Sequence, residues 1–273
     1  MTDAGRVRPI FKWPGGKFKL LDPIIEELPS GTRLVEPFVG SGCVFLNTAY
    51  DAYLLCDVNE DVIGFYRRLT AEGAAFVAGC RALFADGNGA ETYYERRERF
   101  NILPPGDERA ELFLYLNRHG YNGLIRYNSK GGYNVPFGRF AKPYFPEYEM
   151  LAFLAKAEKV RVEFAAADFR ETFARLGPGD VVYCDPPYYP LSTTANFTSY
   201  AGNTFGLAEQ GELAALMERA AADGVRVVAS NHDLPAVREM YAGAGSLRSL
   251  RVQRSISCDK NNRGTADEIL AVF

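Results

Sequence analysis

The chain has 273 residues, of which 47% are hydrophobic, and a formal net charge of −3. Such a chain can bury one large core, or a core with a smaller appended domain, which excludes a disordered protein. Its apolar runs are far shorter than the roughly 18 to 20 residues of a membrane span, and its first residues, "MTDAGRVRPIFKW", lack the apolar core of a signal peptide. We therefore expect a cytoplasmic protein without membrane contact.

Short apolar runs bounded by turn residues alternate with helical patterns, which favours an α/β fold with a parallel sheet over a β-sandwich. We expect strands at residues 33–38, 53–58, 160–164, 180–185 and 225–230, and two closing strands in "SLRSLRV" and "EILAVF". Helical patterns cover residues 59–69, 108–116, 150–157 and 207–222, and Asn59 is a typical helix N-cap. Between residues 87 and 146 this alternation gives way to Gly, Asn and aromatic residues. We expect that segment to be an insertion that packs against the sheet.

The first expected strand runs into "VGSGCVFLN", where Gly40 and Gly42 lie at a strand-to-helix turn. A turn without side chains lets a nucleotide-like ligand approach closely, although the same glycines also suit an ordinary tight turn. Asp57 ends the second strand, where an acidic residue can accept hydrogen bonds from both ribose hydroxyls. The third glycine of the dinucleotide fingerprint is missing, which argues against a bound pyrophosphate. A nucleoside without phosphates fits better, and the expected cofactor is S-adenosylmethionine.

The methionine end of this cofactor needs partners for a carboxylate and an ammonium group. The segment "FKWPGGK" offers Lys17 as a cation after a Gly-Gly turn, and Trp13, the only tryptophan, as a packing wall. A surface lysine beside a core tryptophan is the alternative interpretation, and these residues alone leave both open.

The stretch "DVVYCDPPYYP" ends an apolar strand on Asp185, two prolines and Tyr188. Ligands of open parallel sheets bind at the carboxyl ends of the strands, so this turn should face the same crevice as Asp57. An amino group between the Asp185 carboxylate and the carbonyl of Pro186 would donate both protons and keep its lone pair toward an electrophile, while Tyr188 stacks on the ring that bears it. A conjugated amine is barely basic, so orientation and hydrogen bonding must lower the barrier. A turn that merely caps a strand is the alternative.

Between residues 112 and 146 the chain has five basic residues, no acidic residue and nine Phe or Tyr. An acidic protein thus carries a basic, aromatic segment, as binding to DNA requires. Within it, Asn122 and Arg126 have side chains of the types that read adenine and guanine edges in the major groove. A solvated surface with some core aromatic residues is the alternative.

Several motifs together, in this order along nearly the whole chain, resemble the DNA adenine methylases of the Dam type: "FKWPGGK", "VEPFVGSG", "FLYLNRHGYNGLIRYN", "NVPFGRF", "KPYFP", "VVYCDPPY", "ANFTSY", "SNHD" and "RSIS". The resemblance implies a Rossmann-like S-adenosylmethionine-dependent methyltransferase sheet, formed by residues 1–60 and 147–273. It implies an inserted, mostly helical target-recognition domain at residues 61–146. The implied activity is methyl transfer to the 6-amino group of a flipped adenine in double-stranded DNA, typically in GATC.

The resemblance also implies roles for individual residues. The catalytic residues would be Asp185, Pro186, Pro187 and Tyr188. The cofactor would be bound by Trp13, Lys17, Phe38, Val39, Gly40, Ser41, Asp57, Asp168, Phe169 and Asp185. Together with the basic segment, the resemblance implies DNA contacts at Lys12, Arg118, Tyr121, Asn122, Leu124, Arg126, Asn134, Pro136, Arg139 and Lys142. One departure is Phe140, at a position where close relatives have tyrosine, because it removes a hydroxyl from the expected DNA surface.

Two other functions stay open at this stage. A related amino methyltransferase would act on RNA guanine or on a protein glutamine, although neither substrate needs the basic aromatic insertion. A non-catalytic DNA-binding homologue is the other alternative. We expect a monomer without a metal: the five cysteines lack metal-ligand spacing and should be buried thiols, and His119 and His232 should be structural. Near the end of the chain, basic residues would be able to touch phosphates: Arg248, Arg251, Arg254, Lys260 and Arg263.

Overall fold

The computed structural model describes residues 5–85, 87–189, 199–200, 203–253 and 265–273. These residues form a seven-stranded sheet with the strand order β3-β2-β1-β4-β7-β9-β8. Its strands are β1 (Arg33–Glu36), β2 (Ala52–Asp57), β3 (Arg161–Ala166), β4 (Asp180–Cys184), β7 (Arg226–His232), β8 (Ser246–Gln253) and β9 (Thr265–Val272). The first five run parallel, whereas β9 pairs antiparallel with both β7 and β8. A separate two-stranded pair joins β5 (Ser199–Tyr200) to β6 (Asn203–Thr204).

The central strands β1, β2, β4 and β7 are buried on both faces, which explains their nearly continuous hydrophobic runs. Successive residues point to opposite faces, so Tyr53 and Leu55 of β2 join one core cluster while Leu54 and Cys56 join the other. On the second face lie α8 (Phe169–Phe173), α9 (Leu207–Ala222) and α10 (Pro235–Met240). The first face carries η1 (Lys17–Leu20), α1 (Leu21–Glu27), α2 (Cys43–Asn47), α3 (Glu60–Glu72) and α7 (Glu147–Ala157).

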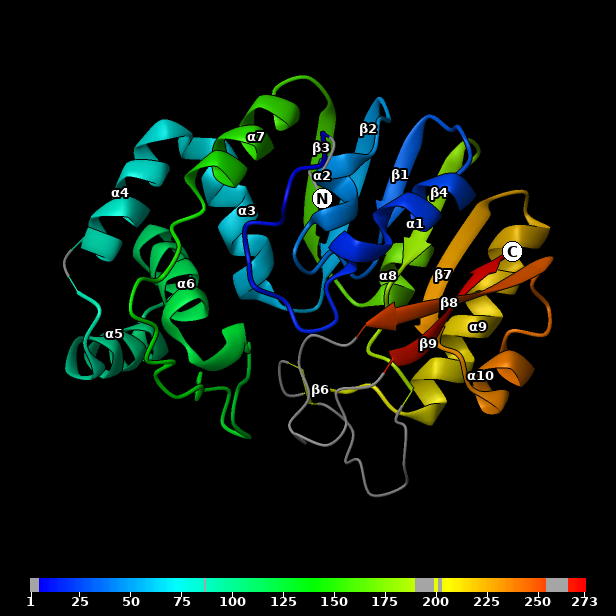
Figure 1. Cartoon of the computed structure of the whole chain (residues 1–273). Helices are drawn as coiled ribbons and strands as arrows, with labels where there is room; N and C mark the ends of the chain where they lie inside the picture. The colour runs from blue at the N-terminus through cyan, green and yellow to red at the C-terminus, as the bar shows by residue number, and fades with distance from the viewer. Residues whose placement is uncertain (1–4, 86, 190–198, 201–202, 254–264) are drawn as a thin grey trace.

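The predicted insertion is mostly helical. It contains α4 (Ala74–Ala85), α5 (Ala90–Ile102), α6 (Asp107–His119) and the short η2 (Tyr121–Gly123). Figure 1 shows α4, α5 and α6 beyond the β3 edge of the sheet, on the opposite side from β8 and β9. Buried side chains of the insertion, such as Phe100 and Tyr133, belong to the same core cluster as Leu34 of β1. The insertion helices α4 and α6 contact α3, which itself contacts β2 and β3, so the insertion joins the sheet through α3.

The expected α/β class with a Rossmann-like methyltransferase sheet is confirmed. The Asn59 side chain accepts a hydrogen bond from the backbone N–H of Asp61 at 3.0 Å, so the predicted N-cap of α3 is also confirmed. The domain boundaries at residues 61 and 147 stay a prediction, because α3 contacts β2 and β3 as well as α6. Among the described residues, no helix is long and apolar enough to span a membrane.

Candidate functional site

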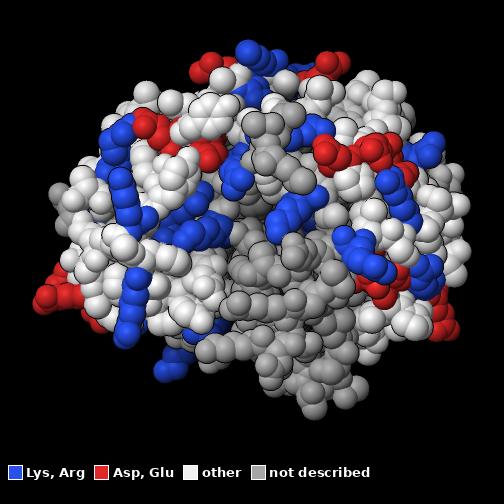
Figure 2. Space-filling view, in the orientation of Figure 1, with Lys and Arg blue, Asp and Glu red and all other residues white. Residues whose placement is uncertain are grey.

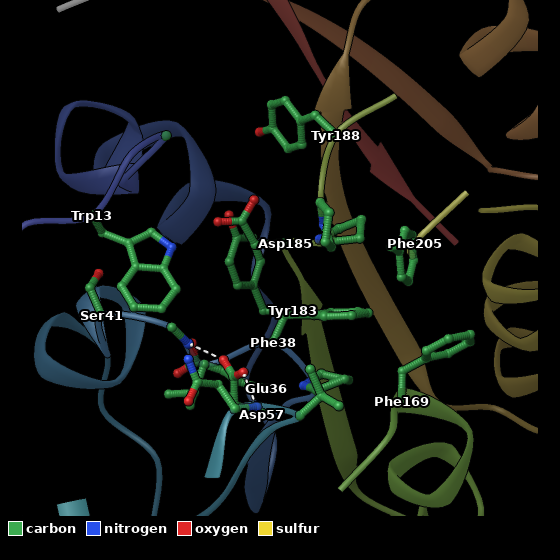
Figure 3. Close-up of a pocket in the computed structure, with 18 of the residues that line it drawn as sticks. Trp13, Glu36, Phe38, Ser41, Asp57, Phe169, Tyr183, Asp185, Tyr188 and Phe205 are labelled. Atoms are coloured by element: carbon green, nitrogen blue, oxygen red, sulfur yellow. Dashed lines mark hydrogen bonds between the residues drawn. The ribbon is translucent and has the colours of Figure 1, made fainter. Parts of the chain in front are cut away.

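The carboxyl ends of β1, β2 and β4 open into one pocket with a volume of about 690 Å³, a size typical of small-molecule sites. All residues predicted to bind the cofactor line it, and so do all four residues of the 185–188 turn. In Figure 3, Trp13 lies on one side of the pocket, Phe169 and Phe205 lie on the other, and Asp185 and Tyr183 lie between them. The structure thus brings together residues as distant in the sequence as Trp13 and His232.

The turn after β1 has a backbone that favours glycine. Gly40 and Gly42 have φ angles of +46° and +66°, and a Cβ at Gly40 would lie 3.0 Å from the Trp13 ring. Asp57 holds this turn, because its carboxylate accepts hydrogen bonds from the backbone N–H groups of Gly40 (3.0 Å) and Asn59 (2.9 Å) (Figure 3). Burial raises the pKa of Asp57 to about 6, although the two N–H groups oppose this shift. Each carboxylate oxygen keeps a lone pair for a further donor, such as a ribose hydroxyl.

Three aromatic rings form the wall opposite Trp13. Phe38 stacks on Phe169 with ring centroids 5.9 Å apart, and Phe205 meets the edges of both at 5.7 and 5.6 Å. Such a wall suits a flat heterocycle. Phe205 was not predicted from the sequence, since nothing in the residues around it indicates that it lies at the pocket. Asp168 caps α8 and pairs with Arg170 at 3.1 Å.

A buried ion pair occupies the centre of the pocket. The Lys17 ammonium lies 2.9 Å from Asp185 Oδ1 and 4.0 Å from Glu268 Oε2, donates to the carbonyl of Gly15 at 2.6 Å, and lies 4.5 Å from the centroid of the Tyr188 ring. The Ser230 hydroxyl also donates to Asp185 Oδ1, at 3.0 Å. Burial raises the pKa of Asp185, and the Lys17 ammonium opposes this shift. No described residue donates to Asp185 Oδ2, so this oxygen remains as an acceptor for a ligand.

Side chains of β7, α9 and β9 hold the 185–188 turn in place. Gln210 donates to the carbonyl of Pro187 at 2.6 Å, and the Tyr188 hydroxyl donates to Glu268 at 2.6 Å. The His232 ring packs edge-on against Tyr188, and its Nδ1 lies 2.7 Å from the carbonyl oxygen of Tyr189. No described residue donates to the carbonyl of Pro186. The sequence predicted that Asp185 and the Pro186 carbonyl accept hydrogen bonds from an amino group. Each of them can still accept a hydrogen bond from a ligand.

Glu36 is a pocket residue that the sequence analysis did not select. It ends β1, its side chain is buried, and its Oε1 has no hydrogen-bond partner among the described residues. Burial raises the pKa of Glu36 to about 8, whereas the nearby Lys156 ammonium lowers it. The sequence did contain a sign that Glu36 is a functional residue, namely an acidic side chain at the carboxyl end of an otherwise apolar strand. Carboxylates are rarely buried without a partner, so such a residue is a candidate for ligand binding.

The predicted DNA-contacting residues form one region at the end of α6. Isolated bridges pair Gly120 with Phe137 and Tyr127 with Tyr133, which brings residues 120–127 alongside residues 133–138. The Arg126 guanidinium donates to the side chain of Asn134 at 2.7 Å and to its carbonyl at 3.1 Å. The exposed members of the predicted set are Tyr121, Asn122, Arg126, Pro136, Arg139 and Lys142. Leu124 and Asn134 are half-buried. In Figure 2, Lys and Arg side chains gather over the centre of the face and the side that carries the insertion.

Two of the residues predicted to contact DNA are less exposed than expected. Arg118 is only 7% exposed and donates to the backbone carbonyls of Pro9 and Ile10, so its charge is used inside the protein. We therefore correct this assignment and leave Arg118 out of the proposed DNA surface. Lys12 is half-buried, and its ammonium lies 3.6 Å from the centroid of the Phe140 ring. The departure at Phe140 thus supplies a packing surface for Lys12.

The remaining predictions concern a basic residue near the end of the chain, the histidines, the cysteines and the absence of a metal. Arg248 pairs with Glu26 (2.9 Å) and Glu27 (3.1 Å), so it does not present a free cation for a phosphate. His119 is buried against Tyr115 with Nδ1 close to its carbonyl oxygen, which is a structural arrangement. The four described cysteines are buried free thiols, namely Cys43, Cys56, Cys80 and Cys184. Outside the described residues lie Cys258, Arg254, Lys260 and Arg263, the "RSIS" motif and most of "ANFTSY". In the described part of the chain, no group of three or more His, Cys, Asp or Glu residues could hold a metal ion.

Comparisons with known proteins agree with this geometry. Residues 13–256 match the family described as D12 class N6 adenine-specific DNA methyltransferase. The chain is 48% identical over 268 residues to a protein named DNA adenine methylase from Vibrio cholerae, covering 97% of this chain and 96% of that protein. It is 48% identical over 267 residues to the DNA adenine methylase of Escherichia coli K12, covering 97% of this chain and 95% of that protein. The corresponding protein of Serratia marcescens is 47% identical over 268 residues, covering 97% and 98% of the two chains.

Proposed function

Because the chain belongs to the family of D12 class N6 adenine-specific DNA methyltransferases, we propose that its pocket binds S-adenosylmethionine and a flipped adenine side by side, so that the methyl group passes directly to the 6-amino group. The protein is a site-specific DNA methyltransferase that modifies adenine. Our proposal assigns the cofactor, the role of each residue and the target sequence.

The donor groups around the pocket fit S-adenosylmethionine. Asp57 would accept hydrogen bonds from the ribose, while Phe38, Phe169 and Phe205 would enclose the adenine ring. Lys17 supplies a cation for the methionine carboxylate. The unpaired Oε1 of Glu36 is a suitable acceptor for the methionine ammonium group, since a buried carboxylate oxygen without a partner is costly. When bound, the cofactor supplies an electrophilic methyl group.

The observation that carries the proposal is the arrangement around Asp185. Its Oδ1 is held by Lys17 and Ser230, whereas no described residue donates to its Oδ2 or to the Pro186 carbonyl, and both residues line the pocket. These two acceptors would take both protons of an adenine 6-amino group and aim its lone pair at the methyl group. As the nitrogen gains positive charge, the Asp185 carboxylate would stabilise it, so the amine does not have to ionise first. The Tyr188 ring would support the flipped base by stacking.

The proposed target is GATC in double-stranded DNA. The exposed residues Tyr121, Asn122 and Arg126 would face the major groove, with Leu124, Asn134 and Pro136 beside them. Arg139 and Lys142 are exposed cations that would contact phosphates, and Lys12 would approach the DNA from the pocket side. We keep a monomer in the cytoplasm as the proposed state and compartment.

Incubation with tritiated S-adenosylmethionine tests this proposal against its alternatives. GATC-containing duplex DNA, RNA and total protein are supplied in parallel to equal amounts of the enzyme. We expect label in DNA alone, and much less in duplexes that differ from GATC at one base. Label in RNA or protein would favour the related amino methyltransferases, and the absence of label with intact DNA binding would favour a non-catalytic homologue.

A further inference from the structure

A buried amide connects the cofactor pocket to the predicted DNA-recognition region. Asn117 lies near the end of α6, is fully buried, and does not line the pocket. Its Oδ1 accepts a hydrogen bond from the backbone N–H of Lys12 at 2.9 Å. Its Nδ2 donates to the carbonyl of Lys12 at 2.9 Å and to the carbonyl of Gly123 at 3.0 Å. One side chain therefore holds two backbone segments that are 111 residues apart, the difference between positions 123 and 12.

Each of the two segments leads directly to a part of the site. Lys12 precedes Trp13, which lines the pocket and packs beside Gly40, and four residues later the chain reaches Lys17. Gly123 ends η2, the turn that carries Tyr121 and precedes Arg126. A movement of residues 12–17 would thus be transmitted through Asn117 to the turn that presents Tyr121 and Asn122.

The two segments also pack closely against each other. Gly123 has a φ angle of +65°, and a Cβ at this position would overlap the side chain of Lys12. The neighbouring Arg118 also donates to the backbone of this segment, at Pro9 and Ile10. Because buried amides that lose their partners are costly, the two segments are constrained to keep one relative position.

We propose that Asn117 is a positioning residue that couples the cofactor pocket to target recognition. The inference rests on the proposed binding of S-adenosylmethionine and GATC DNA. When the cofactor orders residues 12–17, Asn117 holds the Tyr121–Gly123 turn in the conformation that reads DNA. The binding of cofactor and the binding of target DNA then strengthen each other by the same factor, as thermodynamic linkage requires.

Binding measurements with the full-length protein test this coupling. Fluorescence anisotropy gives the Kd for a labelled GATC duplex with and without saturating S-adenosylhomocysteine, which lacks the transferable methyl group. The ratio of the two Kd values is the coupling factor. For the parent we expect a factor of at least about five. In Asn117→Ala it should fall toward one, while the affinity for S-adenosylhomocysteine without DNA stays close to that of the parent.

The chain offers a matched control in Asn101. Its side chain makes the same pair of hydrogen bonds with one backbone residue, accepting from the N–H of Tyr133 at 2.7 Å and donating to its carbonyl at 3.1 Å. These bonds lie within the insertion and do not reach residues 12–17. Asn101→Ala should therefore keep the coupling factor of the parent. If Asn117→Ala does not fold, Gly123→Ala provides the same test. It disturbs the contact between the turn and Lys12 while Asn117 stays in place.

The outcomes separate this inference from the proposed function. If the parent binds neither S-adenosylhomocysteine nor GATC DNA, the proposed function fails, and the inference fails with it. If the parent binds both but its coupling factor is one, or if Asn117→Ala and Gly123→Ala keep the parent factor, only the inference is overturned. Equal losses in Asn101→Ala and Asn117→Ala would also overturn it, because the coupling would then be a general property of the insertion.

Discussion

Asp185 is the residue on which the proposed chemistry depends most. Its carboxylate is half-buried, and one oxygen is paired with Lys17, while no described residue donates to the other oxygen. Burial raises the pKa of Asp185, and the Lys17 ammonium opposes this rise by favouring the charged carboxylate. A carboxylate oriented in this way stabilises positive charge on a substrate nitrogen more effectively than water does, because it needs no reorganisation during the reaction.

Replacement of this residue should separate catalysis from DNA binding. We expect Asp185→Ala to lower the methylation rate at saturating substrates by at least about 100-fold, since one preorganised charge partner is typically worth this much. Affinity for DNA should stay mostly intact, because Asp185 lies outside the basic insertion that is proposed to make most of the DNA contacts. Single-turnover methylation and anisotropy measure the two quantities. A variant that keeps more than about a tenth of the parent rate, a loss below ~1.4 kcal/mol, would show that Asp185 is not the acceptor.

Glu36 gives a prediction about stability and pH. Burial raises its pKa from 4.5 to about 8 in the folded protein. The folded state then holds a proton that the unfolded state has released, so the stability contribution of Glu36 is present below about pH 4.5 and is lost as the pH rises through about 8. Across this window, the free energy of unfolding of the parent should fall relative to that of Glu36→Gln by up to about 1.4 kcal/mol per pH unit.

Urea unfolding of both ligand-free proteins at about pH 5, 6.5 and 8 measures this difference. Asp57, whose pKa burial also raises, titrates in both proteins and so cancels in the comparison. A difference between parent and variant that is the same at each pH would show that Glu36 does not hold a proton in the folded state.

At the scale of elements, the proposed recognition region is a pair of facing segments fixed to the helices around it. The Tyr127 hydroxyl donates to Asp61 of α3 at 2.6 Å, and Tyr121 donates its backbone N–H to the carbonyl of Pro136 at 2.8 Å. These contacts leave Arg126 exposed while Asn134 orients its guanidinium. A preoriented arginine is well suited to a bidentate contact with guanine.

Arg126 and Lys142 should therefore respond differently to replacement by alanine. Arg126→Ala should lose about 1 to 3 kcal/mol of discrimination against duplexes that differ from GATC at one guanine. Lys142→Ala should weaken binding to all sequences alike and reduce the slope of log K against log salt by roughly one. Methylation of GATC and its single-base neighbours, together with a salt titration of binding, distinguishes the two effects. Full discrimination in Arg126→Ala would exclude it as a base-reading residue.

Element prediction from the sequence succeeded where the local pattern determines structure. The apolar runs of β2 and β4 and the capped helix α3 were placed within a few residues. The short helices α2, α8 and α10 were missed, because five or six residues carry too little periodicity. The longer helices α1, α4 and α5 were not assigned individually either. Arg118 was misjudged because its burial depends on Pro9 and Ile10, which are more than 100 residues away in the sequence.

At the scale of the whole molecule, the strand order explains why the site residues meet. Parallel β1, β2 and β4 are neighbours in the sheet, so the turns that follow them open at the same edge. The motifs predicted Trp13, Lys17, Gly40, Asp57 and the 185–188 turn, and the resemblance added the other pocket residues. The structure places all of them around one cavity. Phe205 was not predicted, since its proximity to the pocket depends on packing that no local motif encodes. Glu36 was also missed, although an acidic side chain at the end of an apolar strand was a signal for it.

The proposed position of the adenine between Asp185 and Tyr188 predicts that the target base leaves the duplex. With 2-aminopurine in place of the target adenine, fluorescence should rise on binding because the probe loses stacking with its neighbours. Stacking on Tyr188 would quench part of this rise, so Tyr188→Ala should give a brighter signal and a slower turnover. An unchanged signal in both proteins would argue against a base that flips onto this ring.

The most direct test of the central claim is the chemical identity of the methylated base. A GATC duplex is incubated with the enzyme and S-adenosylmethionine, digested to nucleosides and analysed by mass spectrometry. We predict N6-methyladenine as the product, formed with the parent and nearly absent with Asp185→Ala. A methylated cytosine, a methyl group at another position of adenine, or equal amounts of N6-methyladenine from both proteins would contradict the account.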